Sequence, residues 1–373
     1  MVPDPTFWLN RKVLVTGHTG FKGIWLCSWL IELGAEVTGY ALPPGHAAPL
    51  FEAVGLEGRM TSRIGDVRDL AALRAVMRRE RPEILFHLAG RPIVLDALKD
   101  PVETFTTNVT GTLNLLEAAR AAPDLRAVVA VTSDKVYREP GGRCREEDPL
   151  GGEEPYSASK AAAEHVIAAY RHCYLTPDDG IGLAAARAGN VVGGGDFSPH
   201  RLIPDLVRGI TAGRVVEIRH PDFSRPWQHV LDAVRGYLLL AERLAREPAR
   251  FAGSWNFGPP SDRPAWPVAR IASSFVEAFG RGAWRPLARP AGVEVPRQQL
   301  CAERAFRELG WRTVLDTQAT IAWTVAGYRG LVEAGEGGWL FEQIASYTER
   351  LRAPTDVAEP LAAGGNMRHA GAA

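Results

Sequence analysis

The sequence has little cysteine and no excess of charge of either sign. Its four cysteines are far apart and show no paired spacing, which argues against a zinc site and against a disulfide framework. Lys and Arg together number 43, as do Asp and Glu, so no net field attracts nucleic acid or an anionic membrane surface. These absences favour a small-molecule substrate.

Long apolar runs are also missing. No stretch approaches the roughly 20 apolar residues of a membrane helix, and residues 1–12 lack the apolar core of a signal peptide. We therefore expect a cytoplasmic protein with neither a membrane nor a nucleic acid as partner. At 373 residues, with 46% hydrophobic residues, the chain is long enough to bury a full core.

Apolar runs alternate with helical patterns along the first half of the chain. Runs at 12–17, 36–42, 83–90 and 125–133 indicate buried strands, and residues 25–34, 70–82 and 108–122 have helical spacing. This order predicts an α/β fold: a Rossmann-type doubly wound parallel sheet in residues 1–188. We expect residues 189–350 to form mainly a smaller C-terminal substrate-binding domain with strands returning to the main sheet, and residues 353–373 to be a disordered tail.

The first strand runs into the turn "TGHTGFKG", in which Gly17, Gly20 and Gly23 are spaced three apart. Such a turn before a helix lets the backbone approach a pyrophosphate, although a glycine-rich turn without a ligand is the alternative. The end of the second strand has Tyr40 where an acid would bind the adenosine ribose. On physical grounds alone, NAD and NADP both stay open.

Two further patterns carry reactive groups. Tyr156 and Lys160, four apart at a helix start, share one helical face, so a nearby ammonium would lower the phenol pKa and make the tyrosine a base. Asp134 and Lys135 follow a buried strand in "VTSDKVY". A solvated ion pair worth about 1 kcal/mol at most is the alternative for this pair, but ligands of such sheets bind at the carboxyl ends of strands.

With these motifs the sequence resembles the extended short-chain dehydrogenase/reductase family, whose marks are the TGxxGxxG turn and the YxxxK pair. The stretches "PEILFHLAG", "TSDKVY", "RAGNVVGGGDF", "RLIPD" and "RPWQHV" are similar, more specifically, to nucleotide-sugar 4,6-dehydratases that act on CDP-glucose. The resemblance implies NAD as cofactor, CDP-glucose as substrate, no metal, a homodimer and a role in deoxysugar and polysaccharide biosynthesis.

The resemblance also implies roles for individual residues. Tyr156 would take the proton of the C4 hydroxyl while Thr132 hydrogen-bonds the same oxygen, and Lys160 would hold the nicotinamide ribose. Asp134 would be the acid for the departing C6 hydroxyl, and Lys135 the C5 base. Further implied cofactor contacts are Gly17, Thr19, Gly20, Phe21, Lys22, Gly23, Tyr40, Asp66, Val67, Leu88, Ala89 and Arg187. Implied substrate contacts are Asn190, Arg201, Leu202, Arg225, Trp227 and His229.

Two other functions compete with dehydration. A nucleotide-sugar 4-epimerase or another C4 oxidoreductase would need Tyr156 and Lys160 but leave the Asp134–Lys135 pair unexplained. A non-catalytic NAD-binding scaffold would be expected to have lost some of these groups. The residues at 91–98 depart from the dehydratase pattern, which leaves the sugar open.

Overall fold

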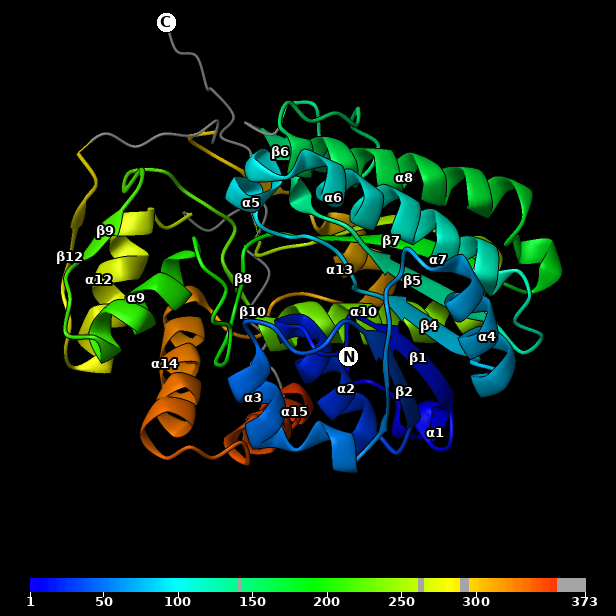
Figure 1. The fold of residues 1–373 in the computed structure, drawn as a ribbon, viewed down its shortest axis with the longest axis horizontal. Helices are drawn as coiled ribbons and strands as arrows, with labels where there is room; N and C mark the ends of the chain where they lie inside the picture. Colours follow the sequence, from blue (N-terminus) through cyan, green and yellow to red (C-terminus); the bar gives the residue numbers. More distant parts are fainter. Residues whose placement is uncertain (140–141, 261–264, 289–294, 354–373) are drawn as a thin grey trace, which may run out of the picture.

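The computed structural model describes residues 1–139, 142–260, 265–288 and 295–353. Its centre is a seven-stranded sheet in which all neighbouring strands are parallel. The strand order is β11 (Gly253–Phe257), β7 (Gly182–Ala188), β5 (Ala127–Val131), β4 (Ile84–His87), β1 (Lys12–Thr16), β2 (Glu36–Ala41) and β3 (Thr61–Ile64). This is the doubly wound sheet that the alternating pattern predicts (Figure 1).

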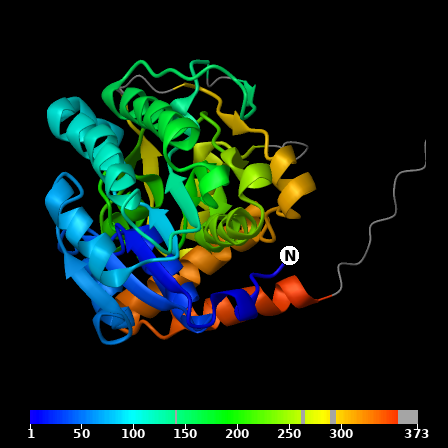
Figure 2. The ribbon, with the colours of Figure 1, turned by 90° about the vertical axis from the view of Figure 1, so that its right-hand side faces the viewer.

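Both faces of the sheet are covered, because successive side chains of a strand point to opposite faces. In β5, Val128 and Ala130 pack into one core cluster, while Val129 and Val131 pack into the other. The first cluster lies under α4 (Leu70–Glu80), α7 (Gly111–Ala119) and α8 (Pro155–Cys173). The second lies under α1 (Pro5–Trp8), α2 (Phe21–Glu32), α10 (Val230–Arg246) and α15 (Trp339–Arg352). Figure 2 shows α8 and α15 on opposite sides of the molecule.

A smaller lobe has a core of its own, built on Ile203, Phe275 and Tyr328. It contains α9 (Leu202–Thr211), β9 (Val216–Ile218), α12 (Val268–Phe279), β12 (Trp284–Pro286) and α14 (Thr317–Glu333). In Figure 1 this lobe lies beside the sheet, at the left. The chain returns from the lobe region to the main sheet in β11. The predicted disordered tail lies outside the described residues from 354 onward.

Short elements complete the chain. They are α3 (Ala48–Val54), α5 (Val94–Lys99), α6 (Pro101–Phe105), α11 (Pro248–Phe251), α13 (Glu303–Leu309), β6 (Arg143–Cys144), β8 (Val191–Val192), β10 (Gln228–His229), β13 (Gln299–Leu300), a π-helical turn (Thr106–Thr110) and 3₁₀ turns at Leu56–Gly58, Asp134–Val136 and Pro177–Asp179. Among the described residues, no helix combines the length and the apolar character that a membrane span requires.

Two helices differ from the sequence-based expectation. The helix expected at 25–34 begins four residues earlier, at Phe21, because Gly20 is in extended conformation and starts α2 directly after the glycine turn. The helix expected at 108–122 is α7 alone, preceded by the π-helical turn and α6. Asn108 lies in the π-helical turn. Its buried side-chain amide forms hydrogen bonds with the backbone of Arg91 and with the hydroxyl of Ser159.

Candidate active site

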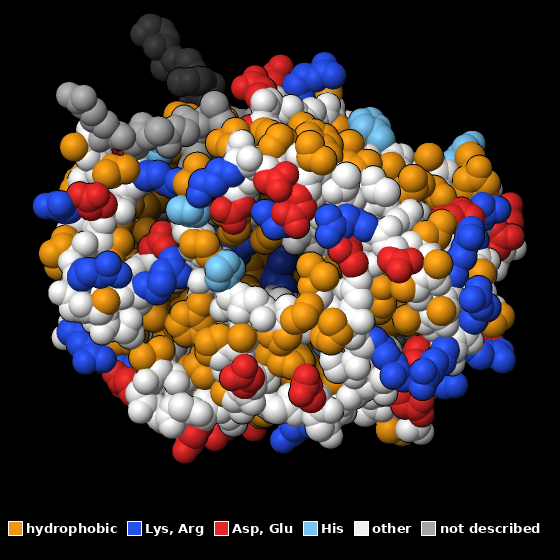
Figure 3. All heavy atoms as spheres, viewed as in Figure 1, with side chains coloured by type: hydrophobic (Ala, Val, Ile, Leu, Met, Phe, Trp, Pro, Cys, Tyr) orange, Lys and Arg blue, Asp and Glu red, His pale blue; other side chains and the backbone are white. Residues whose placement is uncertain are grey.

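A cavity of about 520 Å³ lies at the carboxyl ends of the strands, between the sheet and the smaller lobe. Its walls come from the glycine turn, the ends of β5 and β7, the start of α8 and the segment 189–227. Figure 3 shows the hollow, with Lys or Arg side chains visible inside it. A sheet of this type places its ligands at this edge.

The glycine turn fits a dinucleotide. Gly17 has a φ of +79°, and a Cβ there would lie 2.7 Å from the backbone nitrogen of Ala89. A Cβ on Gly23 would lie 2.1 Å from the carbonyl oxygen of Gly17, so only glycine lets α2 pack this closely on the turn. No side chain caps α2 at Gly20, and the start of this helix lines the cavity. A helix N-terminus with uncapped N–H groups favours an anion such as a pyrophosphate.

The other predicted cofactor contacts divide into two groups. Thr19, Phe21, Lys22 and Leu88 line the cavity. Burial lowers the pKa of Lys22 to about 7, with the cations Lys160 and Arg201 adding to the effect. Four others lie outside the cavity lining, and their contact with the cofactor stays a prediction: Tyr40, Asp66, Val67 and Ala89. The Tyr40 hydroxyl donates to the carbonyl of Asp66 at 3.1 Å, and the Asp66 carboxylate binds Arg68.

Arg187, another predicted cofactor contact, does not line the cavity. Its guanidinium is buried behind the strand end and makes a bidentate ion pair with Glu164, with Nε and Nη2 at 2.8 and 2.9 Å from the two carboxylate oxygens. Arg187 shares its side of the strand with Ala185, whose side chain packs on the cluster under α8. The side chain therefore points to α8 and away from the cavity.

Tyr156 and Lys160 stand at the first turns of α8, as predicted. The carboxylate of Glu154 accepts hydrogen bonds from the backbone nitrogens of Tyr156 and Ser157, and this capping box fixes the helix start. Both Tyr156 and Lys160 line the cavity and are buried. Nζ of Lys160 donates to the carbonyl of Val131 at 3.4 Å.

The pKa values of this pair differ from the expectation. Burial raises the pKa of Tyr156 to about 12, although a hydrogen bond with the Ser133 side chain opposes the rise. Burial lowers the pKa of Lys160 to about 8, against the attraction of the Glu164 carboxylate. The expected lowering of the phenol pKa is thus not found, because loss of hydration outweighs the opposing effects of the Ser133 hydrogen bond and of the Arg201 cation.

Asp134 and Lys135 begin the 3₁₀ turn that follows β5, and both line the cavity. Asp134 is buried; its Oδ1 accepts a hydrogen bond from Ser133 at 3.2 Å, and its Oδ2 has no hydrogen-bond partner. Burial raises its pKa, with Lys135 acting in the opposite direction. A carboxyl group with a raised pKa is suited to act as a proton donor.

Two hydroxyls lie next to this pair. Thr132 lines the cavity, as expected for its predicted role, but it donates its hydroxyl to Glu164 at 2.5 Å. Ser133, which the sequence analysis passed over, bonds Asp134 and Tyr156 instead. Strand alternation would have indicated this, because Thr132 continues the side of Ala130, whose side chain packs under α8.

The predicted substrate contacts mostly line the cavity: Asn190, Arg201, Leu202, Arg225 and Trp227. Nη1 of Arg201 lies 3.0 Å from Oδ2 of Asp196, and Nη1 of Arg225 donates to the carbonyl of Val295 at 2.8 Å. These bonds hold two guanidinium groups at the cavity wall, as binding of a diphosphate requires.

His229, the remaining predicted substrate contact, does not line the cavity. Its ring is fully buried between Trp25 and Trp323, with ring centroids 5.8 and 5.9 Å away. Nδ1 of His229 accepts a hydrogen bond from the backbone nitrogen of Leu231, and this bond caps the start of α10. Burial lowers the pKa of His229 to about 3. The cavity also has lining residues that no sequence motif indicated: His46, Ile93, Val94, Leu95, His200, Arg219 and Tyr328.

Comparison with known proteins places this geometry in a family. The model of the NAD dependent epimerase/dehydratase family matches residues 13–256, which include the glycine turn, Ser133, Asp134, Tyr156 and Lys160. The chain belongs to this family. The family is NAD dependent, so the cofactor of this chain is NAD.

The relatives of this chain include dehydratases and epimerases that act on nucleotide sugars. The chain is 45% identical to the CDP-glucose 4,6-dehydratase of Salmonella typhimurium, over 83% of this chain and 88% of that protein. It is 28% identical to a dTDP-glucose 4,6-dehydratase of Xanthomonas campestris, over 84% and 92%.

Solved structures of family members share the fold. A double mutant of the dTDP-glucose 4,6-dehydratase DesIV from Streptomyces venezuelae, with NAD bound, has a TM-score of 0.74 at 27% identity, covering 87% of this chain and all of that one. The UDP-glucose 4-epimerase of Thermus thermophilus, in complex with NAD, has a TM-score of 0.73 at 26% identity, covering 85% and 99%. The Rossmann-type fold inferred from the sequence is confirmed.

Proposed function

We propose that this protein is a hydro-lyase that converts CDP-glucose to CDP-4-keto-6-deoxyglucose and water. The observation that carries the proposal is the buried, partly unpartnered carboxyl of Asp134 beside Lys135 in the same cavity as Tyr156 and Lys160. Epimerisation at C4 requires neither the proton donor Asp134 nor the base Lys135. The 45% identity to a CDP-glucose 4,6-dehydratase supports CDP-glucose as the substrate.

The residues divide the chemistry among them. The glycine turn and Lys160 would hold NAD, which would supply an acceptor for the C4 hydride and a source of hydride for C6. Tyr156 removes the proton of the C4 hydroxyl, and Ser133 hydrogen-bonds the same oxygen. Because burial raises the pKa of Tyr156 to about 12, this step needs positive charge near the phenol, which Lys160 provides from the same helix face.

Elimination follows at C5 and C6. The C4 ketone acidifies the C5 hydrogen, and Lys135 in its neutral form removes that proton. The C6–oxygen bond breaks as Asp134 donates its proton to the departing hydroxyl, so that water leaves and a C5–C6 double bond forms. Once C6 is reduced, Lys135 would give its proton back to C5, and the 4-keto-6-deoxy sugar would result. The proton that Tyr156 took from the C4 hydroxyl would make up for the one that Asp134 gave to the departing water. Burial raises the pKa of Asp134, which favours the protonated form that this role requires.

We propose that the two parts of the chain divide the ligands. Residues 1–188 contribute the glycine turn and the reactive groups. Residues 189–350 contribute mainly the nucleotide-sugar contacts, among them Arg201 and Arg225. The apolar wall of Ile93, Val94 and Leu95 belongs to the first part and faces the sugar, where the sequence departs from the dehydratase pattern.

The function is tested by mass spectrometry of nucleotide sugars after incubation with the purified protein and NAD. CDP-glucose is compared with UDP-, dTDP- and GDP-hexoses. Loss of one water from CDP-glucose alone is the expected result. Loss of water from a different nucleotide sugar would overturn the proposed substrate, and inversion at C4 without water loss would overturn the reaction.

We also propose that the protein is a cytoplasmic homodimer whose product enters polysaccharide biosynthesis. Support for the dimer comes from four exposed apolar side chains on neighbouring elements of one face: Leu98, Val102, Phe105 and Leu113. Val102 of α6 is 73% exposed. Large apolar patches mark association surfaces. Val102→Asp is expected to give a monomer in light scattering, whereas Val215→Asp, at an exposed valine elsewhere, is not.

A further inference from the structure

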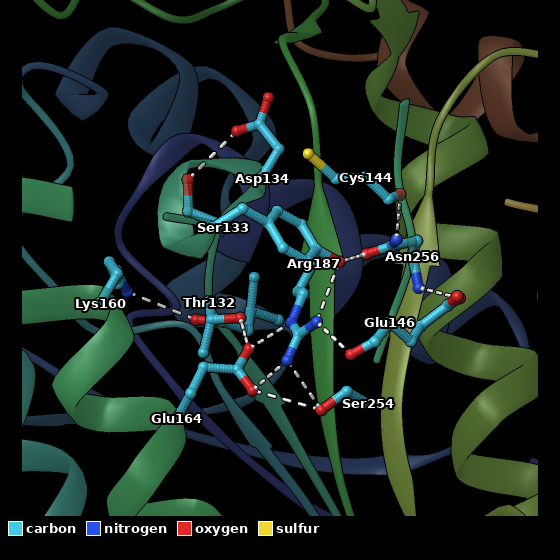
Figure 4. A network of polar contacts seen from close by, with 12 residues as sticks. Thr132, Ser133, Asp134, Cys144, Glu146, Lys160, Glu164, Arg187, Ser254 and Asn256 are labelled. Atoms are coloured by element: carbon cyan, nitrogen blue, oxygen red, sulfur yellow. Dashed lines mark hydrogen bonds and ion pairs between the residues drawn. The ribbon is translucent and has the colours of Figure 1, made fainter. Parts of the chain in front are cut away.

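Both ends of the turn that carries Ser133, Asp134 and Lys135 are tied to one buried ion pair. At the first end, Thr132 donates its hydroxyl to Oε1 of Glu164 at 2.5 Å. At the second end, Nη1 of Arg187 donates to the hydroxyl of Tyr137 at 2.9 Å. Figure 4 shows this network next to Asp134 and Lys160.

The two anchoring side chains are themselves held firmly. The Tyr137 hydroxyl donates to Oδ1 of Asn256 at 2.7 Å, and the Arg187 guanidinium lies over the Tyr137 ring with its centre 5.0 Å from the centroid. Ser254 accepts from Nη2 of Arg187 at 3.0 Å and donates to Oε2 of Glu164 at 3.3 Å. The network therefore joins β5, β7, α8 and β11 behind the cavity.

Stability alone is a poor explanation for this ion pair. Arg187 and Glu164 have side chains exposed by only 3% and 2%, and transfer of such charges out of water consumes much of their attraction, so that apolar residues often serve folding equally well. A buried pair is better suited to fix one geometry than to add stability. The ion pair holds Thr132 and Tyr137, the two residues that flank the reactive turn.

We infer that the Glu164–Arg187 pair is a positioning device that clamps the turn at residues 133–136 from both ends. Glu164 lies on the same face of α8 as Tyr156 and Lys160, at positions i, i+4 and i+8. The clamp thus sets the acid and the base on the turn against the tyrosine on the helix. Misplacement of reacting groups by about 1 Å lowers rates by about 100-fold, so the clamp acts on kcat.

The test uses the two neutral ends of the clamp, since removal of Glu164 or Arg187 leaves an unpaired buried charge that endangers folding. Thr132→Val removes a hydroxyl without changing the side-chain shape, and Tyr137→Phe does the same at the other end. Thr132→Ser keeps the donor and serves as the rescue. The matched control is Thr324→Val in α14, which removes a buried hydroxyl bonded to the carbonyl of Thr320.

Two measurements are made on the full chain with NAD. Hydrogen exchange by mass spectrometry is expected to show exchange at residues 132–137 that is about 10-fold faster in Thr132→Val and Tyr137→Phe. Steady-state kinetics with CDP-glucose should show kcat lowered about 10-fold or more. KM should stay within about 2-fold, because Thr132→Val keeps the size of a lining side chain and Tyr137 does not line the cavity. Thr132→Ser and Thr324→Val should match the unchanged protein in both measurements.

The two measurements separate the inference from the proposed function, on which its kinetic part rests. Exchange at residues 132–137 that stays unchanged in both variants overturns the clamp, whatever the substrate is. Equal losses of kcat in Thr324→Val would also overturn it, since a general loss of stability would then suffice. If the unchanged protein does not dehydrate CDP-glucose, the proposed function fails, and the exchange result alone decides on the clamp.

Discussion

Ser133 donates its hydroxyl to one carboxylate oxygen of Asp134, while the other oxygen of Asp134 is buried without a hydrogen-bond partner. Buried polar atoms without partners are uncommon in folded proteins and often mark a functional role. The arrangement leaves one oxygen of the acid for a ligand in the cavity. It also couples the acid to Ser133, which bonds Tyr156 as well.

Replacement of this acid should separate the two halves of the reaction. Asp134→Asn keeps the shape and the acceptor for Ser133 but cannot supply the proton for the departing hydroxyl. We expect kcat for water loss to fall by about 10²- to 10⁴-fold, while reduction of NAD in a single turnover persists. Unchanged water loss, followed by mass spectrometry, would remove Asp134 from the mechanism.

The same acid predicts a pH dependence. Because burial raises the pKa of Asp134, the carboxyl stays protonated to a higher pH than an exposed aspartate does. The rate of elimination should therefore fall as the pH rises through this pKa, and the residual rate of Asp134→Asn should lack that fall. The measurement is a pH profile of kcat with both proteins.

Ser133 is expected to matter for C4 oxidation. Ser133→Ala removes the hydroxyl that bonds the C4 oxygen in the proposed reaction, and we expect reduction of NAD in a single turnover to slow about 100-fold. Ser28→Ala is the control, because Ser28 is a buried serine of α2 whose hydroxyl has no hydrogen-bond partner. A normal rate in Ser133→Ala would return the role to another group.

Two glycines of the cofactor turn should respond differently to alanine. Gly23→Ala places a Cβ 2.1 Å from the carbonyl oxygen of Gly17, so both the melting temperature and NAD affinity should drop. At Gly20 the nearest atom to an added Cβ is 3.4 Å away, so Gly20→Ala should keep its melting temperature. We expect it to lose about 10-fold or more in NAD affinity, measured by calorimetry, because the methyl group occupies the space that the pyrophosphate approaches.

Buried Glu242 predicts a pH-dependent stability. Its Oε1 accepts hydrogen bonds from the backbone of Asp4 and from Trp8, and burial raises its pKa to about 7 from 4.5. Because the folded state favours protonated Glu242, the contribution of this group to the free energy of unfolding is fully present below pH 4.5. It is lost as the pH rises to about 7. Relative to the unchanged protein, Glu242→Gln should therefore gain about 3 kcal/mol in unfolding free energy across that range.

Urea denaturation from pH 4 to 8 measures this difference. Glu349→Gln, at an exposed carboxylate of α15, is the control and should show no such trend. A constant difference between Glu242→Gln and the unchanged protein at all pH values would contradict the assignment.

Local patterns predicted the parts of the site that depend on local geometry. The glycine spacing, the helix start at Tyr156 and the strand end at Asp134 are set by residues a few positions apart, and these lie where the sequence indicated. Arg187 and His229 lie away from the cavity lining, which the sequence did not indicate, because their surroundings come from distant segments: Glu164 on α8 in one case, Trp25 and Trp323 in the other. Strand alternation could have indicated that the Thr132 hydroxyl points towards α8.

The lining residues His46, His200 and Arg219 were missed for a different reason. They belong to loops, and their sequence surroundings carry no periodic pattern or spacing that marks a ligand. His46 lies in the loop between β2 and α3, and His200 and Arg219 lie in the segment around α9 and β9, so distant parts of the chain bring them to one cavity. Such positions follow from tertiary structure, which a single sequence does not reveal by local pattern.

The cavity is lined by residues from nearly the whole length of the chain, from Gly17 in the first turn to Tyr328 in α14. The Tyr328 hydroxyl donates to the backbone of Asp196, another lining residue. A nucleotide sugar that binds here contacts the sheet and the lobe together, and so acts as a cross-link between them. Its binding energy should be spread over both parts, and heating of the complex should melt them in a single transition at a higher temperature.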